Sequence, residues 1–255
     1  MKYNIKLKNE HDVALLRESG KRLARVLDAV SKEVKPGVTT KYLNDFVYKM
    51  ITDMGDKPAF LNYKPFGASY PYPGSICISV NDEVVHGIGG DRVLQEGDIV
   101  GLDGGVTHKG MISDSACTVS VGKISKEDEE LMRVTKEALM AGIRAAKCGN
   151  YVNDISRAIE KSIPKKYGIV KILSGHGVGY KVHEEPYVPN FDDGVKGPKL
   201  VPGLVLALEP MVTLGTDEVY LADDGYTFIT KDHKKSAHFE HTILITEGDA
   251  EILTA

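Results

Sequence analysis

The sequence predicts an α+β fold made of two similar halves, and three observations support this. Helical patterns occur in two pairs, strand-like segments occur in runs, and two segments 106 residues apart (209 − 103) share one pattern. Strict alternation of strands and helices, typical of a parallel α/β sheet, is not seen. The 255 residues are 42% hydrophobic and 27% charged, an ordinary globular composition. No low-complexity linker divides them, so we expect one domain over residues 1–255 with a short N-terminal segment, residues 1–11.

The first pair of helices is expected before residue 55. In residues 12–35, apolar side chains recur at steps of three, four and seven, and Pro36-Gly37 ends the run. Thr40 is expected to cap the second helix, which closes near Gly55.

The second pair is expected between residues 125 and 164. Ser125 and Asp128 have the spacing of a capping box for a third helix, which runs to Gly149. A fourth helix, with apolar residues at helical spacing, ends before Pro164.

The rest of the chain is mostly strand-like, with clusters of Gly, Pro, Asp and Asn between the segments. The expected strands are residues 76–80, 99–106, 113–121, 204–212 and 242–246.

An internal echo supports the idea of two similar halves. Residues 97–103 and 203–209 each begin with Gly, continue through an apolar run and end in Leu and a carboxylate. Residues 35–45 and 147–154 are also alike, with matching ends at offsets of 112 (147 − 35) and 109 (153 − 44). The alternative is chance similarity of helix ends and strands. A true duplication would bring carboxylates from equivalent strands to one centre.

Composition excludes several classes of protein. The net charge is −4 and the lysines and arginines are scattered, which argues against a nucleic-acid partner. Three cysteines without a CxxC pair indicate free thiols in a reducing compartment. No apolar stretch approaches the ~18 residues that a membrane span needs, and the N-terminus lacks the apolar region of a secretory signal. We therefore expect a cytoplasmic protein without a membrane partner.

Four carboxylates lie in or beside apolar strands. Asp103 and Glu209 each follow an apolar run, Asp114 lies in an expected strand, and Glu240 precedes Thr-Ile-Leu-Ile. A carboxylate buried among apolar residues is costly unless it is paired, protonated or bound to a metal. Four in similar settings indicate a shared centre that divalent cations neutralise.

Three histidines are candidates for the same centre. His176 is flanked by glycines, which allow close approach of backbone and ligand, His183 begins His-Glu-Glu-Pro, and His86 ends a strand at a glycine. Any one of them alone is more often structural than functional. The sequence has no GxSxG, HExxH, P-loop or early GxGxxG motif. Cys77, in Ile-Cys-Ile, is expected to be a small apolar residue rather than a nucleophile.

Taken together, these residues resemble the type I methionine aminopeptidases over residues 12–253. The segments that carry the resemblance are Val-Asn-Asp-Glu-Val-Val-His-Gly-Ile (80–88), Gly-His-Gly-Val-Gly (175–179), His-Glu-Glu-Pro (183–186), Leu-Glu-Pro-Met (208–211) and Phe-Glu-His-Thr (239–242). The resemblance implies the pita-bread (creatinase/aminopeptidase-like) fold, a pseudo-twofold pair of α+β halves. This agrees with the internal echo.

The resemblance also implies a role for each residue. Asp103 holds one metal, His176 and Glu209 hold a second, and Asp114 and Glu240 bridge both. His86 and His183 contact the substrate, and Glu209 relays a proton from the attacking water. The residues that resemble the family's pocket wall are Tyr72, Cys77 and Tyr226.

The implied reaction removes the initiator methionine from nascent chains and N-terminal Met peptides, with a small second residue preferred. Two divalent cations, among Co, Mn, Fe and Zn, suit a donor set of four carboxylates and one imidazole. They would activate the attacking water, and ligation of a free α-amino group would explain why only the first bond is cut. We expect a monomer, and docking to the ribosome stays open.

Two departures from the family concern the pocket. Relatives commonly have Trp at the position of Tyr226, whereas this chain has no Trp, and residues 68–74 are one residue shorter than in the family version.

Two alternative functions follow from the same fold. One is cleavage at Xaa-Pro bonds by an aminopeptidase or prolidase, although those relatives usually carry an extra N-terminal domain. The other is a non-catalytic binding module, which tends to lose ligands, whereas all five are present here.

Overall fold

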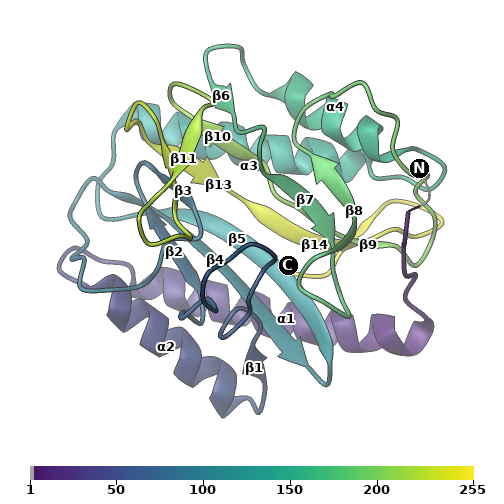
Figure 1. Cartoon of the computed structure of the whole chain (residues 1–255), viewed down its shortest axis with the longest axis horizontal. Coiled ribbons are helices and arrows are strands. Elements are labelled where there is room, and N and C mark those ends of the chain that lie inside the picture. The colour runs from purple at the N-terminus through teal and green to yellow at the C-terminus, as the bar shows by residue number, and fades with distance from the viewer. Residues whose placement is uncertain (1–2) are drawn as a thin grey trace.

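The computed structural model describes residues 3–255, and a nine-stranded sheet shared by both halves of the chain lies at its centre (Figure 1). Its strands are β1 (Lys57–Pro58), β2 (Cys77–Val80), β4 (Ile99–His108), β5 (Met111–Ser120), β7 (Ser174–Gly177), β8 (Glu184–Pro189), β9 (Val205–Leu208), β14 (Glu240–Leu244) and β15 (Glu251–Ile252). The order is β1-β4-β5-β14-β9-β7-β8, with β2 also on β4 and β15 also on β14. All of these pairs are antiparallel.

Two smaller sheets complete the strands. One contains β13 (Ser236–His238), β10 (Met211–Thr213) and β6 (Gly168–Ile169), in that order. The other contains β11 (Val219–Leu221), β12 (Phe228–Thr230) and β3 (Glu83–Val85).

Four helices form the two predicted pairs. They are α1 (Glu10–Glu33), α2 (Thr40–Asp53), α3 (Lys126–Ala145) and α4 (Val152–Ser162). The capping box of Ser125 and Asp128 at the start of α3 is confirmed. The predicted cap of α2 is wrong by one residue: the Thr39 hydroxyl accepts the Tyr42 N–H at 3.2 Å. The Thr40 hydroxyl is instead engaged with the backbone of Gly90, which fastens the helix to a distant loop.

The two halves meet at the centre of the large sheet, where β5 pairs with β14. Helix α1 packs on β4 and β5, and α3 packs on β9 and β14. In Figure 1 the pair α1 and α2 lies below these strands and the pair α3 and α4 lies above them. The predicted α+β class with two similar halves is confirmed.

Each helix pair covers its own apolar cluster. Leu23 and Leu43 pack with Leu102 of β4 in the first half, and Leu131 packs with Leu206 of β9 in the second. Burial of each such side chain contributes roughly 1.5–3 kcal/mol. Because successive side chains of a strand point to opposite faces, the residues next to Leu102 in β4 and next to Leu206 in β9 face away from the helices.

The predicted strand over residues 204–212 is wrong. Strand β9 ends at Leu208, β10 begins at Met211, and the two belong to different sheets. The interruption contains Pro210, which has no N–H to donate to a sheet. The break leaves Glu209 at the end of β9.

Candidate active site

Strand register brings the predicted carboxylates to one face of the large sheet. Asp103 of β4 and Glu240 of β14 both lie opposite Ala116 of β5, so the three strands carry them in one row. His241 pairs with Leu208, and the chain therefore places Glu209 next to Glu240. Residues in one row of an antiparallel sheet share a face. The acidic row thus consists of Asp103 from the first half of the chain and Glu209 and Glu240 from the second half.

A second row lies two residues along the same strands. The backbone N–H of Asp114 donates to the Thr242 hydroxyl at 2.9 Å, Thr242 pairs with Ala207, and Ala207 pairs with His176 of β7. Since side chains two residues apart point to the same face, Asp114 and His176 face the same side as the acidic row.

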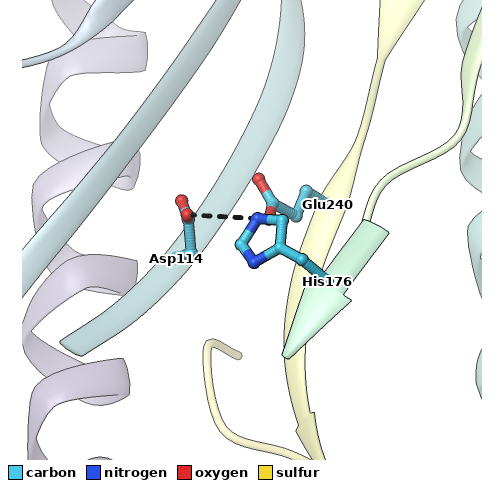
Figure 2. A group of neighbouring side chains, drawn as sticks. All are labelled: Asp114, His176 and Glu240. Atoms are coloured by element: carbon cyan, nitrogen blue, oxygen red, sulfur yellow. Dashed lines mark ion pairs between the residues drawn. The ribbon is translucent and has the colours of Figure 1, made fainter. Parts of the chain in front are cut away.

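Figure 2 shows Asp114, His176 and Glu240 turned toward one another from β5, β7 and β14. One ligand atom from each of the three lies within 4.8 Å of the others. His176 Nε2 is 3.9 Å from Asp114 Oδ2 and 3.3 Å from Glu209 Oε1. These separations bring an imidazole and several carboxylates around one point.

The cluster is buried and short of hydrogen-bond donors. Asp114 and Glu240 are only 3% and 2% exposed. One oxygen each of Asp103, Asp114 and Glu240 is buried without a hydrogen-bond partner. Buried acceptors without partners are costly, and a cation satisfies several of them at once. The residues therefore fit the divalent cations that the sequence predicts.

Burial also sets the protonation of the cluster. It raises the pKa of Asp103 to about 7. Burial, together with repulsion by the neighbouring carboxylates, raises the pKa values of Asp114, Glu209 and Glu240 well above their usual range. Without a cation, the four groups cannot all be ionised at neutral pH, because like charges in a desolvated site oppose one another.

His176 is prepared to act as a neutral ligand. Burial lowers its pKa to about 3. Its Nδ1 lies 3.0 Å from the Gly177 carbonyl oxygen, which can only accept, so Nδ1 carries the proton. The Nε2 lone pair is then free and points toward the carboxylates, and a backbone contact of this kind also fixes the orientation of a ligating ring.

All ten predicted site residues line one pocket, whose empty volume is about 600 Å³ including the part open to solvent. The pocket has four further lining residues that the sequence did not predict: Phe60, Tyr63, Pro65 and Val182.

One wall of the pocket is apolar. Tyr72, Cys77 and Tyr226 form a buried cluster with Phe60 and Val182. The rings of Tyr72 and Tyr226 meet edge to face with centroids 5.1 Å apart. Burial raises the pKa of the Cys77 thiol well above its usual range, which agrees with its interpretation as an apolar residue because the thiolate is the nucleophilic form.

The histidines expected to contact the substrate lie at the same pocket. His86 follows β3 in a left-handed conformation, with φ of 63°, and burial lowers its pKa to about 4. The His183 ring lies 4.5 Å from the His176 ring, and burial lowers its pKa as well. Both imidazoles are therefore neutral at neutral pH and can donate a hydrogen bond from one nitrogen.

Two polar residues at the site were missed. The Tyr63 hydroxyl lies 2.9 Å from His183 Nδ1, so it orients that ring. His238 Nε2 lies 4.0 Å from Glu209 Oε2 and is buried without a hydrogen-bond partner. Tyr63 is half-buried in an irregular loop, where no periodicity identifies a side chain that faces a site. His238 is two residues before Glu240, but the two residues belong to different strands, β13 and β14, so no strand periodicity linked them.

Comparisons with known proteins agree with this geometry. Residues 14–247 match the model of metallopeptidase family M24. The chain is 44% identical to the methionine aminopeptidase of Clostridium perfringens, over 97% of this chain and 98% of that one. The crystal structure of methionine aminopeptidase from Rickettsia prowazekii has a TM-score of 0.94 at 38% identity, covering 98% of this chain and 100% of that one.

A more distant structure shows the fold alone. The prolidase from Pyrococcus furiosus has a TM-score of 0.76 at 23% identity, and the match covers 98% of this chain but only 65% of the prolidase. None of the helices that the structure describes combines the length and the hydropathy that crossing a membrane requires. The chain belongs to metallopeptidase family M24 and, within it, to the methionine aminopeptidases, which are metal-dependent hydrolases with the pita-bread fold.

Proposed function

We propose that this chain removes the N-terminal methionine from peptides and nascent chains when the second residue is small. The observation that supports this most strongly is one pocket with two unlike walls: a buried acidic cluster with a neutral imidazole, and a buried apolar cluster. The apolar wall would take an unbranched thioether side chain, and the acidic wall would hold the cations that hydrolysis needs.

We assign two divalent cations to the acidic wall, from the set Co, Mn, Fe and Zn. Asp103 would hold one, His176 and Glu209 the other, and Asp114 and Glu240 both. When bound, the cations supply activation of a water molecule and stabilisation of developing negative charge. An oxygen-rich donor set with one imidazole is compatible with each of these metals.

The remaining steps belong to the chain's own groups. The Glu209 carboxylate would take a proton from the attacking water and pass it to the leaving amine. His86 and His183 would donate hydrogen bonds to the scissile amide, and neutral imidazoles can do so from a protonated nitrogen. Tyr63 would keep His183 in the orientation for that contact. Because the substrates include nascent chains, the enzyme would act in the cytoplasm, and we propose that it acts as a monomer.

A short peptide panel tests this function. Purified protein supplied with Mn or Co is given Met-Ala-Ser, Leu-Ala-Ser, Met-Leu-Ser and Ala-Pro-Ser, each with and without EDTA. We expect cleavage of Met-Ala-Ser alone and no cleavage with EDTA. Faster cleavage of Ala-Pro-Ser would move the function to proline-directed peptidases, and no cleavage of any peptide would favour a binding role.

Replacing His86 separates its role from that of the metal ligands. His86→Ala is expected to lower kcat/KM for Met-Ala-Ser by ~100-fold, as for loss of one preorganised hydrogen-bond donor, with the metal content unchanged. Metal analysis and steady-state kinetics check both parts. His108→Ala is a matched control, because His108 is also buried but pairs with Asp56 at 2.8 Å, outside the pocket. Loss of metal from His86→Ala would instead make His86 a ligand.

A further inference from the structure

A second hollow adjoins the catalytic pocket. It is a groove between the N-terminal segment and β8, with an empty volume of about 650 Å³ including the part open to solvent. The residues that line it are Asn4, Lys6, Tyr180, Lys181, His183, Glu184, Glu185 and Tyr187. His183 lines both the groove and the catalytic pocket. The two hollows therefore meet at a histidine that the proposed mechanism places beside the scissile bond.

One wall of the groove is held rigidly by a buried ion pair. Lys8 Nζ lies 2.7 Å from Glu184 Oε2, and the two side chains are 1% and 8% exposed. The other oxygen of Glu184 accepts the backbone N–H groups of Tyr180 and Lys181 at 2.6 and 2.9 Å. The Lys8 N–H donates to the Gly203 carbonyl at 2.8 Å. The N-terminal segment is thus fixed against the turn that precedes His183, and the charge of Glu184 is neutralised.

The charges left in the groove are mostly positive. Lys6 and Lys181 are exposed, and among residues 3–255 neither ammonium takes part in an ion pair. Glu185 supplies one carboxylate, which also accepts the Asn4 N–H. The groove therefore has two positive charges, Lys6 and Lys181, and one negative charge, Glu185, although the overall net charge of the chain is −4. The exposed rings of Tyr180 and Tyr187 add apolar surface to the same groove.

We propose that this groove receives the substrate residues that follow the second residue, and that it favours acidic side chains there. The proposal rests on the proposed function. With methionine against the apolar wall and the scissile bond beside His183, the rest of the substrate must leave past His183. The groove begins at that point. The ammonium groups of Lys6 and Lys181, which have no ion-pair partner among residues 3–255, attract carboxylates, and the tyrosine rings provide contact area for an extended chain.

The test compares two substrates that differ only beyond the third residue, Met-Ala-Ser-Glu-Ala-Glu and Met-Ala-Ser-Lys-Ala-Lys. At low ionic strength, the ratio of their kcat/KM values is expected to favour the acidic peptide by about 5-fold, since exposed charge pairs are weak. The variants Lys6→Glu and Lys181→Glu should each lower this ratio by about 3-fold or more. High salt should bring it toward one in the unmodified protein, since the Debye length falls to roughly 3 Å at 1 M.

Lys35→Glu is the matched control, because it makes the same change in net charge beyond the far end of α1. That helix has 24 residues and is therefore about 36 Å long. For Lys35→Glu, the ratio of the kcat/KM values for the acidic and the basic peptide should equal that of the unmodified protein. If Lys6→Glu and Lys181→Glu leave the ratio as Lys35→Glu does, the groove does not receive the chain. Cleavage of Met-Ala-Ser is measured separately in the unmodified protein, so failure of the groove and failure of the proposed function give different results.

Discussion

Asp114→Asn is expected to lower kcat/KM for Met-Ala-Ser by at least ~10³-fold, a loss typical of removing a group essential to catalysis. Asp114 lies with His176 and Glu240 in the group whose ligand atoms are within 4.8 Å of one another. An amide keeps the shape of the side chain but removes the negative charge that Asp114 would provide to the cations under the proposed assignment. Metal content after dialysis should fall together with the rate, and Glu240→Gln should behave in the same way.

The same substitution is expected to stabilise the metal-free protein by about 1–3 kcal/mol, a large effect for one residue. The reason is that Asp114 is 3% exposed and its pKa is raised by burial and by the charge of Asp103. At neutral pH the metal-free fold must either keep Asp114 protonated or hold it charged beside its neighbours. A neutral amide removes that cost and can donate to those neighbours. Thermal unfolding in EDTA measures the change.

Asp128→Asn is the matched control, for which we expect lower stability and an unchanged rate. Asp128 is 4% exposed, but it closes the capping box of α3 and lies 2.9 Å from the Lys235 ammonium. Its substitution should lower stability by about 1 kcal/mol, the usual effect of weakening a cap, and leave the rate unchanged. If Asp114→Asn keeps a near-normal rate and metal content, the assignment of ligands is wrong.

The carboxylates of the site were predictable because their chemistry conflicts with their local setting, whereas the pocket residues Tyr72, Cys77 and Tyr226 were expected only from the family resemblance. Asp103 and Glu209 stand out in sequence since carboxylates beside apolar strands require a partner. The cap of α3 was predictable for a similar local reason: Ser125 and Asp128 satisfy each other over three residues.

What could not be predicted depends on pairing between distant segments. The register that sets Glu240 beside Ala116 joins strands more than a hundred residues apart, and no local pattern encodes it. His176 lies in β7, a strand that its glycine-rich sequence did not predict because glycine is depleted in strands. Lys8 lies in the short N-terminal segment, where no local pattern indicates burial, yet it is buried against Glu184. In each case a tertiary contact overrides the local propensity.

Removing the metal is expected to destabilise the protein increasingly as the pH rises above about 6.5, the ordinary pKa of histidine. In the metal-free fold the pKa of Asp103 is raised to about 7, and those of Asp114, Glu209 and Glu240 are raised further above their usual range. A carboxyl group with a raised folded pKa contributes stability below its unfolded pKa and loses it as the pH rises through the folded pKa. Each proton so retained gives a slope of about 1.4 kcal/mol per pH unit.

The buried histidines have the opposite sign but a different pH window. Burial lowers the pKa of His86 to about 4 and those of His176 and His238 to about 3. Their unfolded forms take up protons below about 6.5, so they oppose folding only in acid. Well above that pH they are neutral in both states and contribute no slope, so the carboxylates dominate the trend until the thiols of the unfolded chain begin to ionise at about pH 8.5.

Thermal unfolding in EDTA between pH 6.5 and 8.5 should therefore show a Tm that falls by several degrees per pH unit, at roughly 2–4 °C per kcal/mol for a chain of this size. Saturating Mn should remove most of the fall, because bound cations keep the carboxylates ionised in the fold. Asp114→Asn should show a shallower fall in EDTA, since one of the repelling groups is gone, whereas Asp128→Asn should keep the slope. A Tm in EDTA that does not change over this range would mean that the four carboxylates are already relieved by other contacts, and the argument for a cation at their centre would lose its physical basis.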